Sequence, residues 1–165
     1  MKAKKIFNPK VFTTILTLDE LKKTTDSMPY YLFQIALTAR LLAGKNCLEK
    51  IKFDKKELRL EIERELMLFL IQYRHAFLDT GFFEKRELFN SIPQSLKKIL
   101  RGILYLKGEK TSGFRQDLKR IEELLKIKAR LSEKSNARIP IDEKLLAVHE
   151  FLEELFNKVN DLKVK

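Results

Sequence analysis

Few residues in this sequence could support metal or acid–base chemistry, and their spacing argues against both. The two histidines, His75 and His149, lack the second ligand at His-x-x-x-His or Glu-x-x-His spacing that a helical zinc or di-iron site requires. His149 and Glu150 begin like a zinc-protease motif, but the second histidine is missing. Both histidines are therefore predicted to be structural, with no metal site and no cofactor.

Nucleophile and phosphate-binding motifs are incomplete as well. The single cysteine, Cys47, excludes an internal disulfide, and the sequence pairs it with no His, Asn or Asp that would activate the thiol. The segment GEKTSG at 108–113 has the two-glycine frame of a P-loop, but Phe114 and Arg115 stand where a Lys and a Ser or Thr belong. Neither motif predicts catalysis or nucleotide binding.

Paired carboxylates do not change this interpretation. Glu61 and Glu65 lie four residues apart on a predicted helix, which is typical of two like charges on an exposed face rather than of an acid/base dyad. The sequence therefore predicts a protein that is not an enzyme. The alternative is an enzyme with a cryptic polar site around His75 or His149.

Binding chemistry is better represented, in a basic stretch that includes an aromatic residue. Residues 85–130 hold 13 basic and 5 acidic residues, a net charge of +8, whereas residues 141–161 hold 2 basic and 6 acidic residues, a net charge of −4. Lysine and arginine contact phosphates and release counterions, and a tyrosine can stack on a base. The residues predicted to bind nucleic acid are Lys97, Lys98, Arg101, Tyr105, Lys110, Arg115, Lys119 and Arg120.

The same charges have two structural interpretations. They could be the solvated outer faces of two amphipathic helices, which are common in any helical bundle. They could also complement the acidic last helix inside the bundle, which would partly cancel the basic patch.

The last predicted helix, about 142–162, has an apolar stripe with alternating steps of four and three residues, which is a heptad pattern. This stripe is either the core-facing side of a bundle helix or a surface for a partner protein or a second copy. Phe151 and Phe156 widen the stripe, which favours burial within the chain. The candidate partner-binding residues are Leu145, Val148, Leu152, Leu155 and Val159.

A central helix from Asp54 to Gly81 is the element around which the others must be arranged. Asp54 and Glu57 form a capping-box pattern, and Gly81 is placed to end the helix. Six consecutive apolar residues, 66–71, predict that the middle of this helix is covered on all sides. One face carries Leu58, Ile62, Leu66, Phe69, Tyr73 and Phe77.

The remaining pattern predicts an all-α fold: a single-domain bundle of five to six helices with a short extended N-terminal arm. Extended pieces are expected near 11–16 and 45–53, and a linker at 135–140. The arm and a short helix occupy residues 1–27, and the bundle occupies 28–165. The other predicted helices are 18–24, 29–44 ending at Gly44, a helix opened by Pro93 after a short turn at 82–92, and 114–133.

Composition places the chain among globular intracellular proteins. It has 165 residues, of which 44% are hydrophobic and 35% charged, with a net charge of +11. The basic N-terminus lacks the apolar run of a signal peptide, and the longest apolar segment, 30–44, is too short to span a membrane and contains Arg40. We expect a cytoplasmic, nuclear or nucleoid location with no membrane span.

Two segments resemble a known family. SMPYYLFQIAL at 27–37, in which a proline and aromatics open an apolar helix, is similar to the start of the helical domain in some GINS subunits. IPQSLKKILRGILYLKG at 92–108 is similar in placement to their long bundle helices. The resemblance, over residues 28–107, implies a non-catalytic helical subunit that docks onto protein partners in a replication-type, nucleic-acid-associated assembly. The alternative is a stand-alone DNA- or RNA-binding protein that uses the 97–120 face.

Overall fold

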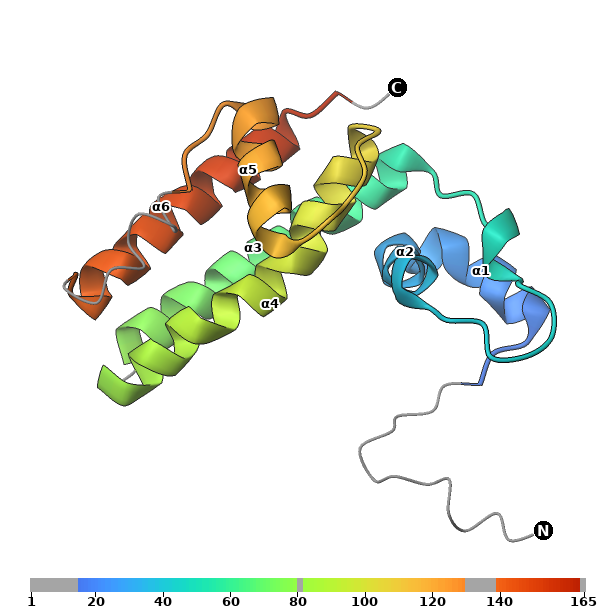
Figure 1. Cartoon of the computed structure of the whole chain (residues 1–165), viewed down its shortest axis with the longest axis horizontal. Coiled ribbons are helices and arrows are strands. Elements are labelled where there is room, and N and C mark those ends of the chain that lie inside the picture. Colours follow the sequence, from blue (N-terminus) through green and yellow to red (C-terminus); the bar gives the residue numbers. More distant parts are fainter. Residues whose placement is uncertain (1–14, 80–81, 130–138, 164–165) are drawn as a thin grey trace, which may run out of the picture.

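The computed structural model describes residues 15–79, 82–129 and 139–163, and within them all regular structure is helical (Figure 1). This confirms the all-α bundle of five to six helices. The described residues contain no strand, so the extended piece predicted at 45–53 is wrong: that segment is a loop with a single 3-10 turn. The elements are α1 (Leu18–Ser27), α2 (Pro29–Thr38), η2 (Leu48–Lys50), α3 (Lys55–Asp79), α4 (Phe82–Leu106), α5 (Phe114–Leu125) and α6 (Ile141–Asn160).

The long helices α3, α4 and α6 lie side by side, and α5 crosses α4 (Figure 1). The start of α3 is as predicted: Asp54 Oδ1 accepts hydrogen bonds from the backbone N–H groups of Lys56 and Glu57, at 2.7 and 3.1 Å. The core lies between these helices and draws one apolar stripe from each. On α3 that stripe consists of Leu58, Ile62, Leu66, Leu70 and Tyr73.

The central helix is not covered on all sides. Within the apolar run 66–71, Leu68 is 46% exposed and Ile71 is 42% exposed. Helices α2, α4 and α6 all pack against α3, and the fully buried residues of α3 lie on one side of it. One apolar strip of α3 therefore faces outward, made of Leu60, Leu68, Ile71 and Leu78.

Helix α2 is shorter than predicted. It ends at Thr38, and Leu42 in the following loop is 93% exposed. Gly44 does adopt a positive φ of 85°, but it turns the loop instead of capping the helix. Only the first turns of α2 reach the core, so nothing stabilises a helical continuation through 39–44.

Helix α4 runs without interruption through Pro93, so the predicted helix start at this proline is wrong. A proline removes one intrahelical hydrogen bond. Its neighbours Ile92 and Leu96 are buried while Pro93 is exposed, so core packing on one side of α4 holds the helix together across the proline.

Helix α5 ends at Leu125, well before the predicted residue 133. Lys126 adopts a left-handed conformation with φ 56°, which stops the helix. The chain beyond it is held by the Ala129 N–H, which donates to Glu122 Oε1 at 2.7 Å, and by burial of Ile127. Residues 130–138, which include most of the predicted linker, lie outside the described ranges.

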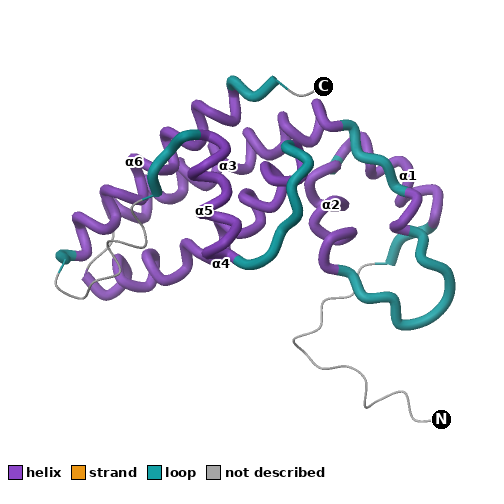
Figure 2. Tube along the Cα trace, turned by 45° about the horizontal axis from the view of Figure 1, so that its top comes forward, coloured by secondary structure: helices purple, strands orange, loops and turns teal. Residues whose placement is uncertain are grey.

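Helices α1 and α2 lie beside the end of the bundle where α3 begins and α4 ends (Figure 2). Thr17 and Glu20 form the predicted capping box at the start of α1, which extends to Ser27. Helix α2 packs against α1 on one side and against α3 and α4 on the other. The division of the chain at 27/28 falls between α1 and α2 and stays a prediction, and the strand-like segment 11–14 lies outside the described residues.

Candidate binding groove

The apolar stripe of α6 is used inside the chain. All five candidate partner-binding side chains are 0% exposed, because α6 packs against α3 and α4. The hydroxyl of Tyr73 on α3 donates to the backbone carbonyl of Leu145 at 2.7 Å and ties the two helices together. The interpretation of this stripe as a partner surface is therefore corrected for Leu145, Val148, Leu152, Leu155 and Val159.

Three of the eight candidate nucleic-acid-binding residues are brought together. Lys97, Lys98 and Arg101 line one groove between α2, α3 and α4. Tyr105 does not line it: its ring packs against Phe33 with ring centroids 4.7 Å apart. The sequence-predicted face is therefore divided in the folded chain.

The other basic candidates lie on α5 and the loop before it. Arg120 is bound by two carboxylates, Glu109 at 2.7 Å and Glu123 at 3.2 Å, and its hydrogen bonds to them raise the pKa of its guanidinium. This pairing cancels part of the basic charge through neighbouring residues, and the acidic last helix adds one pair, Asp142 Oδ1 of α6 with Lys85 Nζ of α4 at 2.8 Å. Exposed residues that do not line the groove are Lys110, Arg115 and Lys119.

The groove has a volume of about 860 Å³ and combines apolar, amide and charged groups. Aromatic and aliphatic side chains from all three helices form its apolar part. The three amides come one from each helix, and the acidic group comes from α3. The apolar lining residues are Tyr30, Tyr31, Ile35, Leu68, Phe69 and Ile99, and the amides and the acid are Gln34, Gln72, Gln94 and Glu65.

A glycine near the end of α4, Gly102, lets the three helices meet. A Cβ atom at Gly102 would lie 2.6 Å from Ile62 Cδ1 of α3 and 3.4 Å from Tyr30 Cε2 of α2. Gln34 of α2 adds a polar contact, donating from Nε2 to the Lys98 carbonyl of α4 at 3.0 Å. These contacts place the first turns of α2 beside the basic face of α4.

Two buried polar atoms on the groove wall have no hydrogen-bond partner among the described residues: Tyr30 Oη and Arg101 Nε. Tyr30 is only 7% exposed, and its burial, with a smaller effect of the Glu65 charge, raises the pKa of its phenol well above the ordinary 10.0. The phenol therefore remains a neutral O–H donor. No described carboxylate pairs with Lys97, Lys98 or Arg101 within 4.0 Å.

Sequence reasoning identified the three cations but not the groove. Tyr30, Tyr31 and Gln34 lie on α2 and Gln72 lies on α3, far from the cations in the sequence, and only the packing of α2 and α3 against α4 brings them together. Two local signals pointed towards this contact: a glycine inside the amphipathic α4, and the amide of Gln34 in the otherwise apolar α2.

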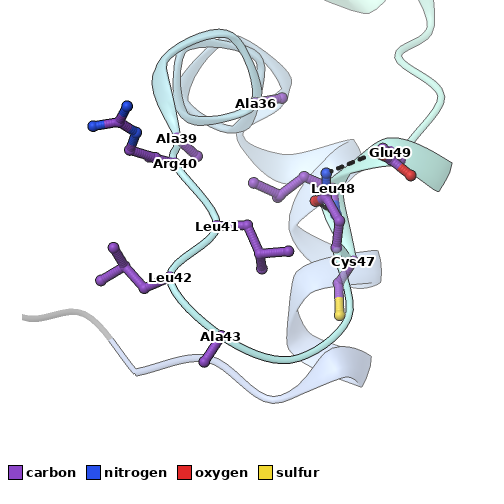
Figure 3. A pocket seen from close by; sticks show the side chains of 10 residues that line it. Ala36, Ala39, Arg40, Leu41, Leu42, Ala43, Cys47, Leu48 and Glu49 are labelled. Carbon is purple, nitrogen blue, oxygen red and sulfur yellow. Dashed lines mark hydrogen bonds between the residues drawn. The ribbon is translucent and has the colours of Figure 1, made fainter.

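A second hollow, of about 540 Å³, lies under the loop that follows α2 (Figure 3). Leu41 points into the loop and Leu42 points away from it, while Asn46 Nδ2 donates to Glu49 Oε1 at 3.0 Å. Cys47 is exposed, and its thiol donates to the Lys45 carbonyl at 3.4 Å. The hollow under the loop also includes Arg40 and Glu49, and Cys47 lines a smaller hollow with Lys22 and Lys52.

Neither histidine lines the groove. His149 Nε2 accepts a hydrogen bond from Arg74 Nε at 2.9 Å and lies 3.5 Å from Glu153 Oε1, while His75 is exposed on α3. In the described ranges, no three His, Cys, Asp or Glu side chains gather in a way that could hold a metal ion. The described helices also include none that is both long and apolar enough to cross a membrane.

Comparisons of the chain with protein-family models, with curated proteins and with solved structures found no match.

Proposed function

We propose that this protein is a non-catalytic interaction subunit that docks onto a partner protein within a larger, nucleic-acid-associated assembly. The observation that carries the proposal is the groove between α2, α3 and α4, which combines an apolar lining with three cations that pair with no described carboxylate. The net charge of +11 and the resemblance of residues 28–107 to GINS subunits support a nucleic-acid-associated setting.

The outward strip of α3 adds apolar surface next to this groove. Leu60, Leu68, Ile71 and Leu78 fall within about 80° of one another at 3.6 residues per turn, on the side opposite the buried stripe. Leu68 belongs to both the strip and the groove wall. Adjoining apolar surfaces of this kind mark protein contacts more often than catalytic sites.

A position-specific photo-crosslinking experiment tests the proposal. Benzoylphenylalanine replaces Gln72, an exposed groove residue, or Lys119, an exposed residue of α5, in the full chain expressed in its source cells. We expect discrete adducts with a partner protein from position 72 and none from position 119. Equal labelling from both positions, or labelling from neither, would contradict a docking role for the groove.

Direct nucleic-acid binding is the second candidate function, favoured by the absence of described carboxylate partners for Lys97, Lys98 and Arg101. It predicts binding of DNA or RNA that weakens steeply with salt. Fluorescence anisotropy compares a Lys97, Lys98, Arg101 triple alanine variant with a matched Lys110, Arg115, Lys119 triple alanine variant. Loss of binding in the first variant only would support this function. An equal loss of affinity in both variants would mean that the protein attracts nucleic acid only through its overall positive charge.

A further inference from the structure

We infer that the groove recognises an acidic amphipathic segment of the partner protein, and that Tyr30 Oη and the Arg101 guanidinium bind a carboxylate of that segment. The inference rests on the proposed docking function. It adds the chemistry of the docking segment and the two residues that bind its carboxylate.

The first argument is the pair of unsatisfied donors. Leaving a buried polar group without a partner costs about 1–3 kcal/mol, so native proteins rarely retain one without a reason. The Arg101 guanidinium can only donate, and the neutral phenol of Tyr30 has a proton to donate. A carboxylate has two acceptor oxygens, one for each of these donors.

The second argument is charge. Lys97, Lys98 and Arg101 give the α4 side of the groove positive charge, and among the described lining residues Glu65 is the only acidic one. A negatively charged acceptor is therefore preferred over a neutral one. The chain's own first 14 residues contain four lysines and no acidic residue, so charge complementarity does not favour them as the occupant.

The third argument separates a peptide from a nucleic acid. Six of the lining residues are aromatic or aliphatic, and the amides of Gln72 and Gln94 can pair with a peptide backbone. A nucleic acid would need a longer track of cations, but Arg120 is held by carboxylates and the other basic candidates do not line the groove. An amphipathic helix can place its apolar residues against the apolar lining and its acidic residues against the cations of the groove.

The test selects ligands from a phage-displayed library of 16-residue random peptides on the purified full chain. We expect the enriched peptides to carry apolar residues at helical spacing and at least one Asp or Glu. Their affinities for variants are then measured by fluorescence anisotropy. Tyr30→Phe, which removes only the unsatisfied hydroxyl, is compared with Tyr105→Phe, the same change at a tyrosine outside the groove.

Tyr30→Phe and Arg101→Gln should each weaken binding by about tenfold or more, because each removes a hydrogen bond to a charged group. Tyr105→Phe should leave the affinity unchanged. The Tyr30→Phe variant should melt at a temperature no lower than that of the unchanged protein. If the hydroxyl had only a structural role, its removal would lower the melting temperature.

Three results would overturn the inference: the library yields no enriched peptides, the enriched peptides lack acidic residues, or they bind the Tyr30→Phe variant as tightly as the unchanged protein. Binding of a 12-nucleotide oligo-dT that depends on Tyr30 would reassign the groove to phosphate, and groove-dependent self-association would reassign it to a second copy. Photo-crosslinking from position 72 tests the docking function separately. Adducts there, together with failure of the peptide test, would remove only the carboxylate specificity.

Discussion

At the scale of single residues, two buried tyrosines of this protein differ in one hydrogen bond. Tyr73 Oη donates to the Leu145 carbonyl at 2.7 Å, whereas Tyr30 Oη has no partner among the described residues. Both rings are almost fully buried. The first hydroxyl stabilises the contact between α3 and α6, whereas the second belongs to a residue of the groove wall.

Replacing each tyrosine by phenylalanine should therefore have opposite effects. Tyr73→Phe should lower the free energy of unfolding by about 1 kcal/mol, because a buried hydrogen bond is lost. Tyr30→Phe should leave it unchanged or raise it slightly, because an unsatisfied group is removed. Urea denaturation measures both changes, and an equal loss of stability in the two variants would mean that Tyr30 Oη is satisfied in solution.

The same two phenols should make the fold sensitive to alkali. Burial raises the pKa of Tyr30 and of Tyr73 above the ordinary 10.0. Because the unfolded phenols lose their protons first, their contribution to stability is complete below that pH and is lost as the pH rises towards the folded pKa. The urea concentration at the midpoint of unfolding should therefore be lower at about pH 11 than at about pH 9. A double phenylalanine variant that shows the same fall would assign it to other groups.

At the scale of elements, helix ends are held by side chains from distant helices. Arg59 of α3 has a half-buried side chain, and its Nη1 donates to the Asn160 carbonyl at 3.1 Å and to the Val159 carbonyl at 3.4 Å. The last carbonyls of α6 are orphan acceptors at the negative end of the helix dipole. Arg59 therefore both caps α6 and fixes its end against α3.

Removal of this cap should loosen the end of α6. Arg59→Ala should lower the free energy of unfolding by about 1–2 kcal/mol and speed amide exchange in the last turn of α6. Arg64→Ala is the matched control, because Arg64 is exposed and pairs only with Glu61 of its own helix. A control effect as large as that of Arg59→Ala would show that helix propensity, not capping, is being measured.

At the scale of the whole molecule, Gly102 sets the distances at which α2 and α3 approach α4. Ile62 and Tyr30, which face this glycine, are both buried. A side chain on α4 at this point would separate the helices that form the groove. The groove therefore depends on a contact between three elements and not on any one of them.

Gly102→Ala tests this dependence. Alanine favours the helix by about 1 kcal/mol, but overpacking of a buried contact costs about 1–3 kcal/mol, so we expect a net loss of stability. Ile62→Val removes the Cδ1 atom that lies 2.6 Å from the new Cβ. The double variant should therefore lose less unfolding free energy than the two single variants lose in total. Simple additivity in urea denaturation would contradict a direct clash.

Local patterns in the sequence predicted the features that are decided within one helix. The capping box of Thr17 and Glu20, the cap at Asp54 and the apolar stripes of α3 and α6 depend on neighbours three or four residues apart, and the structure contains them. On α3 the stripe differs in detail from the prediction, because Leu70 is buried while Phe69 and Phe77 are only partly buried. The all-α class follows from the same periodicity. These features require no knowledge of where the other helices lie.

Tertiary packing alone decided the rest. The continuity of α4 through Pro93, the end of α2 at Thr38 and the burial of the α6 stripe depend on which surfaces the neighbouring helices cover. So does the groove, because its tyrosine, glutamines and cations lie on three helices. Residue spacing determines which side chains share a helix face, but burial is a property of two surfaces in contact, and that contact exists only in the folded molecule.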